Sequence, residues 1–187
     1  MAIYEVHTLE TAPEGSRPAL ERLNEDVGVI PNLAATMAES PTLIDSFVTL
    51  RAIYQNGTLT PVEREVISIT NAIVNDCKYC VAAHSSFAVK FGIPPSDLES
   101  LRTGTAPADD KYKALSDFAR KITISRGNVT ESDLNKFVEA GYTRAQGLEV
   151  IVGVAFSVLA NYSNHLTDAP LDEFFRAQSW NGLAKAS

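Results

Sequence analysis

The chain contains only two cysteines, Cys77 and Cys80, and both lie in the stretch NDCKYCVAAH, which also holds His84. At about 3.6 residues per turn, these three positions fall within about 60° around a helix axis, so both sulfurs and the imidazole would face one side. We predict Cys77 in the first helical turn, where unpaired backbone N–H groups and the helix dipole favour a thiolate. His84 follows Cys80 by one turn and could take its proton. Because thiolates attack peroxides and disulfides, this spacing predicts redox chemistry.

A carboxylate upstream of the cysteines extends the pattern. Glu65 lies on the apolar flank of the preceding predicted helix, together with Ile69. A carboxylate in that position either reaches water or is buried with a partner. Glu63 is different, because the capping box at the start of the helix accounts for it. A helix hairpin that turns near Asp76 would lay Glu65 against the Cys–His stripe, where it could orient or protonate His84.

Three interpretations of the cysteine pair remain open from these residues. The first is a redox dithiol, which the shared stripe favours. The second is a zinc site, whose further ligand would have to be Glu65, His7 or His165, since no second cysteine pair exists. The third is a pair of inert cysteines packed in the core. His165 near the end of a long helix is explained by the helix dipole alone, and we expect His7 to be solvated.

The elements that must position these residues are helices. Capping residues, amphipathic spacing and Gly or Pro stops predict helices over 16–28, 31–40, 41–57, 60–75, 76–91, 96–104, 109–125, 130–139, 143–164 and 170–180. Asp76 is the predicted cap of the helix that carries the cysteines. No alternating strand pattern or hairpin signal interrupts them. We therefore predict an all-α helical bundle, one domain over 1–187 with its core at about 20–175.

Composition restricts the possible partners and location. The formal net charge of −7 disfavours nucleic acids and anionic membranes, which bind basic surfaces. The N-terminus shows no secretory pattern, and the apolar run 150–160 is too short to span a bilayer. We therefore expect a cytoplasmic protein with no membrane and no nucleic-acid partner. In a reducing cytosol, a close cysteine pair is more often catalytic or metal-binding than structural.

An internal similarity leaves two interpretations open. A shift of 84 positions places Glu65 on Glu149, Cys77 on Asn161 and Cys80 on Asn164. The windows could be two unrelated core helices, because helical patterning recurs widely. They could also be copies of a duplicated helical unit whose second copy has lost its thiols. In that case Asn161, Asn164 and His165 could form a second site.

Surplus apolar surface predicts self-association. The helix from Thr143 is apolar on nearly every side between Leu148 and Ala160, and such a helix is usually fully buried, in a domain core or in a subunit contact. The C-terminal stretch adds Phe174, Phe175 and Trp180. A chain of this size can enclose one such helix, so a second apolar surface indicates a partner. We expect a homo-oligomer, with Trp180 as a possible anchor between subunits.

Glu65, Cys77-Lys-Tyr-Cys80 and His84 together reproduce the pattern E-x(11)-C-x-x-C-x-x-x-H. This pattern resembles the signature of the alkylhydroperoxidase D-like proteins of the carboxymuconolactone decarboxylase superfamily. The segments VIPNLAATMAESPTLIDSF and ANYSNHLTDAPLDEFF also resemble peroxidase-related members. The resemblance covers about residues 20–175. It is specific because four chemically meaningful positions agree in spacing.

The resemblance implies an all-α fold built from a repeated helical unit and assembled as a trimer or hexamer. It also implies a thiol peroxidase or disulfide reductase site without cofactor or metal. In such a site Cys80 is oxidised to a sulfenic acid, Cys77 resolves it, and Glu65 and His84 relay protons. One position departs from the best-known member, which has a histidine where this chain has Tyr79. A phenol is a weaker base near neutral pH, so one relay member is missing.

The function predicted from the sequence is therefore reduction of a hydroperoxide by Cys80 and Cys77, followed by reduction of their disulfide by an external thiol donor. Neither the peroxide nor the reductant can be named from the residues. Two alternatives are retained. One is a non-peroxidatic binding, redox-sensing or zinc protein. The other is a decarboxylase or isomerase of the same superfamily that uses Glu65 and His84 as acid and base, although those members lack the cysteine pair.

Overall fold

Helices are the only regular elements in residues 4–183, the part of the chain that the computed structural model describes. Their order is η1 (Glu14–Ser16), α1 (Arg17–Val27), α2 (Asn32–Met37), α3 (Pro41–Gln55), α4 (Pro61–Val74), α5 (Lys78–Lys90), α6 (Pro95–Arg102), α7 (Asp110–Ser125), α8 (Glu131–Glu139), α9 (Arg144–Thr167) and η2 (Glu173–Gln178), where η marks a 3₁₀ helix. The prediction of an all-α fold is confirmed.

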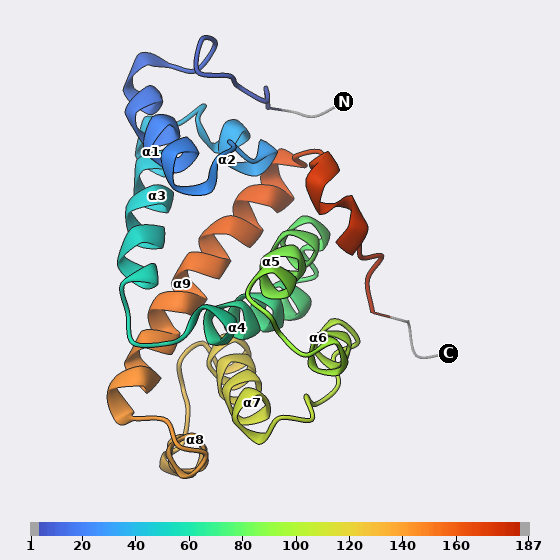
Figure 1. The fold of residues 1–187 in the computed structure, drawn as a ribbon. Helices are drawn as coiled ribbons and strands as arrows, with labels where there is room; N and C mark the ends of the chain where they lie inside the picture. The colour runs from blue at the N-terminus through green and yellow to red at the C-terminus, as the bar shows by residue number, and fades with distance from the viewer. Residues whose placement is uncertain (1–3, 184–187) are drawn as a thin grey trace.

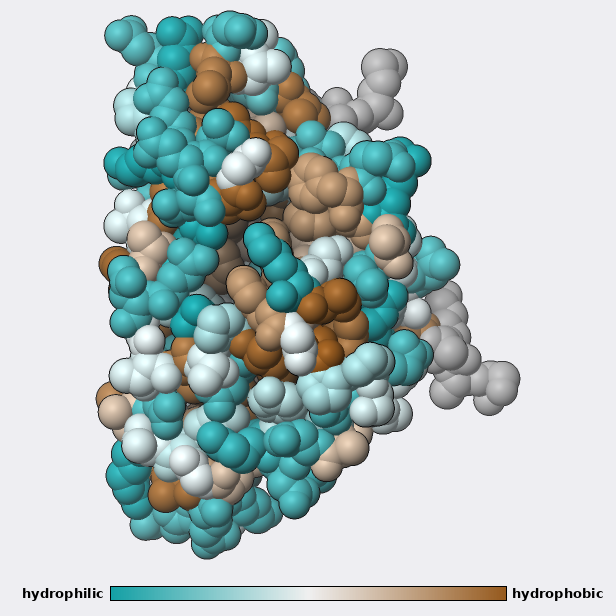
Figure 2. Space-filling view, in the orientation of Figure 1, coloured by the Kyte–Doolittle hydropathy of each residue, from teal (hydrophilic) through white to brown (hydrophobic). Residues whose placement is uncertain are grey.

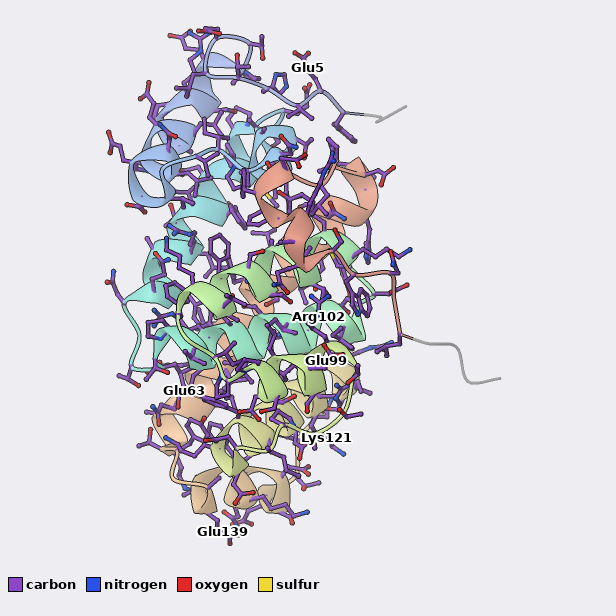
Figure 3. The ribbon with its side chains drawn as sticks, turned by 45° about the vertical axis from the view of Figure 1, so that its right-hand side comes forward. Glu5, Glu63, Glu99, Arg102, Lys121 and Glu139 are labelled. Atoms are coloured by element: carbon purple, nitrogen blue, oxygen red, sulfur yellow. The ribbon has the colours of Figure 1, made fainter. Side chains whose placement is uncertain are left out.

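Side-chain caps set the start of most of the long helices. Ser40, Thr60, Asp109, Thr130 and Thr143 each accept a hydrogen bond from a backbone N–H in the first turn of α3, α4, α7, α8 and α9. At α4 the predicted capping box is present, because the Thr60 N–H donates to Glu63 at 2.8 Å and the Glu63 N–H donates to Thr60 at 3.2 Å. Glu63 is labelled in Figure 3. Its role is structural, as the sequence indicated.

The longest helix, α9, organises the bundle. Figure 1 shows it running from α8 at one end of the molecule to α1 and α2 at the other. It packs against α2, α3, α4, α5, α7 and α8. The α4–α5 hairpin packs against α9, and α4 also packs on α7. The core therefore lies between α9 and this hairpin, which is where the cysteines are found.

One side of α9 is exposed on the single chain, so the core of the bundle alone does not bury this helix, and its burial in a subunit contact stays a prediction. Leu148, Ile151, Tyr162 and Leu166 are each between 49% and 69% exposed. Their spacing places them on one face of the helix, which we term the α9 stripe. The opposite face is enclosed by the bundle and includes Phe156.

By length and composition, α9 is the one helix among residues 4–183 that could cross a membrane. The apolar run judged too short from the sequence is thus part of a longer apolar helix. In the structure, 39% of the most apolar 18-residue window of α9 is buried. Packing at the centre of a bundle is a sufficient reason for an apolar helix of this kind.

A glycine in α9 allows α3 to approach it closely. A Cβ atom at Gly153 would lie 2.5 Å from the hydroxyl oxygen of Tyr54 and 2.7 Å from its Cζ atom. The phenol ring therefore packs directly on the α9 backbone, where only glycine leaves room. This contact fixes Tyr54, which lines the cavity described below.

The C-terminal segment, shown in red in Figure 1, lies over α5. The predicted helix over 170–180 is a short 3₁₀ helix, η2, in which Phe175 is buried and Phe174 exposed. The Trp180 indole N–H donates to the Arg102 carbonyl oxygen at 2.9 Å. The guanidinium of Arg102 (labelled in Figure 3) donates in turn to the Gln178 carbonyl oxygen at 2.9 Å. The indole N–H of Trp180 is thus satisfied within its own chain, and a role of its half-buried ring as an anchor between subunits stays a prediction.

The structure does not support a duplicated hairpin. The 84-residue shift pairs Cys77 and Cys80, which follow a sharp turn, with Asn161 and Asn164, which lie inside the continuous helix α9. At Asp76 the backbone adopts φ +53°, a left-handed conformation that ends one helix before the next begins. No such break occurs within Arg144–Thr167. The matching positions therefore reflect recurrent helical patterning.

Candidate active site

The turn between α4 and α5 places Cys77 at the start of α5. The Cys77 N–H donates to the Ala72 carbonyl oxygen at 2.9 Å, which closes α4. Cys77 is the N-cap residue of α5, and its sulfur accepts a hydrogen bond from the Cys80 N–H at 3.4 Å. The sequence assigned this cap to Asp76 and placed Cys77 in the first turn. The correction keeps the sulfur at the helix N-terminus, where backbone donors stabilise a thiolate.

Both cysteines are free thiols and both are buried. A hydrogen bond from the Cys80 thiol is the main cause that lowers the pKa of Cys77. Burial acts in the opposite direction, and a hydrogen bond from the Cys80 N–H lowers the pKa further. Burial has the opposite effect on Cys80, and together with the proximity of Cys77 it raises the pKa of Cys80 well above its usual range. The first proton lost from the pair therefore leaves a thiolate on Cys77, with the Cys80 S–H donating to it.

Glu65 and His84 meet across the hairpin. The Glu65 carboxylate on α4 lies 2.7 Å from Nδ1 of His84 on α5, and both side chains are more than four-fifths buried. Because a carboxylate only accepts, the shared proton lies on Nδ1, which leaves Nε2 as the atom that can exchange protons. His84 and Cys80 form no hydrogen bond with each other in the part of the chain that the structure describes. They share a cavity instead.

A cavity of about 290 Å³ lies beside this pair. Cys80, His84 and Glu65 line it, whereas Cys77 lies behind Cys80 and is fully buried. Figure 2 shows hydrophobic side chains gathered around a hollow between α3 and α5. The aromatic side chains that line the cavity are Phe47, Tyr54, Tyr79, Phe87, Phe91, Phe156 and Phe175.

The imidazole of His84 is set among these aromatic rings. Its centroid lies 6.4 Å from that of Phe87 and 6.4 Å from that of Phe156, in both cases with tilted ring planes. Phe156 stacks on Phe47 at 5.1 Å. These rings give the cavity an apolar wall, while Arg51, Arg64 and Lys90 also line it. The cavity thus combines an apolar wall with a reactive sulfur and a proton-exchanging imidazole.

Tyr79, which replaces the expected histidine, points away from the proton-relay pair. Its hydroxyl donates to Asp172 at 2.5 Å and accepts from the Leu33 N–H at 3.3 Å. Burial, followed by the Asp172 carboxylate, raises the pKa of Tyr79 far above its usual range. Tyr79 is therefore a structural anchor between α5, α2 and the C-terminal segment.

Sequence reasoning missed Asp172. Its carboxylate accepts from Tyr79 and also from the Asn32 N–H, at 3.0 Å through Oδ1, at the start of α2. Asp172 lies in the irregular stretch between α9 and η2, where no periodic pattern marks a buried residue. In the sequence, its distinguishing feature is its position just before the aromatic pair Phe174 and Phe175.

The remaining polar candidates divide into two groups. Asn161 and Asn164 lie buried on the side of α9 that faces the thiols. His165 is on the exposed side, where its ring stacks on Tyr162, so it belongs to no second site with them. His7 is buried and its Nε2 lies 2.9 Å from a Glu39 carboxylate oxygen, which corrects the expectation that it is solvated.

Residues 4–183 contain no group of three or more His, Cys, Asp or Glu side chains arranged to hold a metal ion. Of the further ligands that a zinc site would need, Glu65 is paired with His84, and His7 with Glu39. The groups near the thiols are the amides of Asn161 and Asn164, which can stabilise a thiolate, and the imidazole of His84, which can exchange protons.

Comparison with known proteins agrees with this arrangement. Residues 41–121, which contain all four of the residues Glu65, Cys77, Cys80 and His84, match the carboxymuconolactone decarboxylase family. This stretch belongs to that family. No curated protein sequence matches the chain significantly.

Solved structures share the fold over nearly the whole chain. A peroxidase-related protein from Ralstonia eutropha JMP134 with the alkylhydroperoxidase AhpD core superposes with a TM-score of 0.81 at 24% identity, covering 93% of this chain and 94% of that one. A peroxidase-related protein from Silicibacter sp. TM1040 gives 0.79 at 20% identity, with 95% of each chain covered. The AhpD-core fold implied by the sequence resemblance is confirmed.

A third similar structure is that of the debrominase Bmp8, as a cysteine-to-alanine variant in complex with 2,3,4-tribromopyrrole. The TM-score is 0.75 at 17% identity, and the match covers 95% of this chain and 97% of that one. At this identity the likeness concerns the fold.

Proposed function

We propose that the protein is a thiol-dependent hydroperoxidase in which Cys80 attacks an organic hydroperoxide. The observation that carries this proposal is the position of the two thiols, because Cys80 lines the cavity together with His84 and Glu65 while Cys77 lies behind it. A substrate in the cavity can reach one sulfur only. The second sulfur is held three residues away, ready for the next step.

In the first step the Cys80 sulfur attacks the distal oxygen of the hydroperoxide. As it does so, the Cys80 proton passes to the Cys77 thiolate, to which it is already hydrogen-bonded. The O–O bond breaks, Cys80 becomes a sulfenic acid, and the alkoxide takes a proton and leaves as the alcohol. His84, protonated at Nε2 and paired with Glu65, is the general acid in the cavity.

In the second step Cys77 condenses with the sulfenic acid. Cys77 gives up the proton that it received in the first step as its sulfur attacks the Cys80 sulfur, the disulfide forms, and the S–O bond breaks so that the leaving hydroxide takes that proton and departs as water. The lowered pKa of Cys77 suits it to this attack. An external thiol or dithiol then returns both sulfurs to the reduced state, with two electrons and two protons.

The size of the cavity favours an organic substrate over hydrogen peroxide. A water-sized molecule occupies about 30 Å³ of liquid volume, roughly a tenth of the cavity. An apolar wall with several aromatic rings contributes to binding only if the substrate has an apolar body to bury. We therefore expect hydroperoxides with an aryl or alkyl group to be reduced more efficiently than hydrogen peroxide.

The decisive experiment is an anaerobic titration of the thiols before and after addition of a hydroperoxide. Titration of the reduced protein should give two thiols per chain, and one equivalent of cumene hydroperoxide should remove both and yield one equivalent of alcohol. No covalent dimer should appear on a non-reducing gel, because the bond is within the chain. Two thiols still titratable after excess hydroperoxide would exclude the proposal.

Two variants separate the roles of the sulfurs. Cys80→Ser should consume no hydroperoxide. Cys77→Ser should react once and stop at a sulfenic acid, detectable as an adduct with dimedone by mass spectrometry. The opposite assignment, a dimedone adduct on Cys77 in the Cys80→Ser protein, would reverse the two roles.

A second candidate is reductive dehalogenation of a small halogenated aromatic ring. The aromatic rings on both sides of His84 favour it, and the fold is shared with a debrominase. The Cys80 sulfur would take the halogen, the ring carbon would keep the electron pair and gain a proton, and Cys77 would then displace halide to form the disulfide. Halide release with loss of two thiols distinguishes this activity from peroxide reduction.

A further inference from the structure

Two buried asparagines on α9 face the two thiols. Asn161 is fully buried and Asn164 is 9% exposed. Asn161 lies against Cys80, and Asn164 against Cys77. The two asparagines are three residues apart, as are the two cysteines. One turn of α9 can therefore place an amide beside each sulfur at the start of α5. The sequence comparison had noted these positions only through the 84-residue shift.

The Asn161 amide is fixed in orientation but incompletely satisfied. Its Oδ1 accepts a hydrogen bond from Nδ2 of Asn75 at 2.8 Å. Asn75 lies at the end of α4, two residues before Cys77, so the turn that carries the thiols also holds the asparagine. The Asn161 Nδ2 atom is buried and has no hydrogen-bond partner of ordinary geometry. A buried donor without a partner is rare in folded proteins and calls for an explanation.

We propose that the Asn161 amide is the hydrogen-bond donor that stabilises Cys80 when its sulfur becomes a thiolate or a sulfenate, and that Asn164 serves Cys77 in the same way. A neutral thiol is a weak acceptor, so Nδ2 of Asn161 gains little in the resting protein. An ionised sulfur is a strong acceptor. The interaction is therefore stronger in the reacting state than in the resting state, as an interaction that increases a rate must be.

The environment of Cys80 makes such a donor necessary. Burial raises the pKa of Cys80, and the Asn161 amide acts against that effect. The nearby carboxylates disfavour a further negative charge, whereas a protonated His84 favours it. The titratable and charged groups around the pair are Asp76, Tyr79, His84 and Lys90 on the turn and α5, Arg64 and Glu65 on α4, Arg51 on α3, Asp26 on α1, Asp172 after α9, and Arg102 on α6, which bonds to Ser85. Unlike the carboxylates, the thiols and the imidazole, the uncharged Asn161 amide donates at every pH.

The proposal rests on Cys80 as the reacting thiol, but its test does not require peroxidase activity. The rate at which iodoacetamide alkylates each cysteine is measured against pH, with the site identified by mass spectrometry. Asn161→Ala should raise the apparent pKa of Cys80 by about one unit and slow its alkylation at neutral pH about tenfold. Asn164→Ala should slow alkylation of Cys77 more than that of Cys80.

A matched pair of variants separates the hydrogen bond from packing. Asn161→Ser leaves a void similar to that of Asn161→Ala but retains a hydroxyl donor, so it should recover part of the lost reactivity. Asn71→Ala on α4 is the control, because Asn71 is also fully buried with an unpartnered Nδ2 atom, but it bonds to Thr123 on α7. It should leave both cysteine rates within about twofold of the unmodified protein.

Equal rates for Asn161→Ala and the unmodified protein, or an equal loss from Asn71→Ala, would overturn the inference. Circular dichroism identifies any variant that fails to fold, in which case the Asn161→Ser protein carries the comparison. Failure of this inference is distinct from failure of the proposed function. If alkylation depends on Asn161 but no peroxide is consumed, the donor role stands and the hydroperoxidase proposal falls.

Discussion

At the thiol pair, the more acidic sulfur is not the one that meets the substrate. Cys77 gains the N-cap hydrogen bond and the lower pKa, whereas Cys80, which lines the cavity, has its pKa raised by burial. Because the two thiols are close, they ionise as a pair and not as independent groups. A proton can therefore move from Cys80 to Cys77 as Cys80 reacts. A buried nucleophile that passes its proton to a resolving thiolate needs no separate base in contact with it.

The mechanism gives a prediction for the pH dependence of the rate. Because Cys80 reacts as its proton passes to the Cys77 thiolate, single-turnover oxidation by an organic hydroperoxide should follow the ionisation of Cys77, whose pKa is lowered by hydrogen bonds from Cys80. The rate should therefore increase with pH and reach a plateau below the usual thiol value of about 8.5. Stopped-flow measurement of tryptophan fluorescence or of residual peroxide gives the profile. A rate that still increases above that value would indicate that formation of the Cys80 thiolate is limiting and would contradict this account.

The Glu65–His84 pair should contribute the proton transfer. His84→Ala or Glu65→Gln is expected to slow hydroperoxide reduction by about tenfold to a hundredfold or more, the size of a lost general acid or base. Circular dichroism should show an intact fold. Glu63→Gln is the matched control, because Glu63 lies on the same helix, where it caps the N-terminus and pairs with Lys111 at 3.5 Å, and it does not line the cavity. An equal loss in that control would mean that helix capping had been mistaken for catalysis.

Among the elements, the C-terminal segment closes one side of the cavity. Phe175 on η2 lines the cavity and packs edge-on against Tyr79 at 6.0 Å and Phe87 at 5.6 Å. Asp172 ties this segment to α5 and to the start of α2. The side-chain amide of Asn32 also donates to the Pro170 carbonyl oxygen at 3.0 Å, so Asp172 is the buried part of this attachment.

Asp172→Ala should loosen this attachment. It leaves the Tyr79 hydroxyl and the Asn32 N–H without their shared acceptor, which costs about 1–3 kcal/mol of unfolding free energy. Urea denaturation measures that loss, and limited proteolysis after α9 should become faster. Glu173→Ala, next to it, removes only an exposed pair with Arg176 and should change stability little. Equal stability of the two variants would show that Asp172 is not the tether.

At the scale of the whole molecule, buried phenols govern stability in alkali. Burial is the largest cause that raises the pKa of Tyr54, Tyr79 and Tyr142 far above the usual value of about 10. Above that pH the unfolded chain releases these protons while the folded chain retains them. The free energy of unfolding should therefore fall as pH rises from about 9 to 11.

Urea denaturation at successive pH values measures this dependence. Tyr54→Phe is the informative variant, because the Tyr54 hydroxyl makes only a long hydrogen bond, 3.5 Å, to the Arg64 carbonyl oxygen. Its stability should decline less steeply with pH than that of the unmodified protein. Parallel curves for the two proteins would remove Tyr54 from the explanation.

The α9 stripe is the surface on which we expect self-association. Exposed Leu148, Ile151, Tyr162 and Leu166 form one apolar face, whereas Trp180 is occupied within its own chain. Light scattering at micromolar concentration should therefore give a mass above that of the single 20.2 kDa chain, as a trimer or hexamer. Leu148→Glu combined with Ile151→Glu should return it to the mass of one chain.

Ile124 on α7 provides the control for this experiment. It is 65% exposed but lies outside the stripe, so Ile124→Glu should leave the assembly intact. A single-chain mass for the unmodified protein would exclude the assembly altogether. Dissociation by both changes alike would show that the stripe is not the interface.

The sequence by itself determined the helices and the four site residues. Caps such as Thr60 and stops such as Gly28 act within one or two turns, so the local sequence specifies them. The spacing of Cys77, Cys80 and His84 on one short segment is local for the same reason. Glu65 could be placed beside them from the sequence because the helix that carries it ends only a few residues before the helix of the cysteines begins.

Only the tertiary structure decided which groups surround those residues. Asn161 and Asp172 reach the site from more than 80 residues away in sequence, through the packing of α9 and the C-terminal segment on α5. The burial that raises the pKa of Cys80, and the use of Tyr79 as an anchor, follow from the same packing. Local patterns determine which residues share a helical face, but desolvation and long-range hydrogen bonds depend on which helices enclose that face.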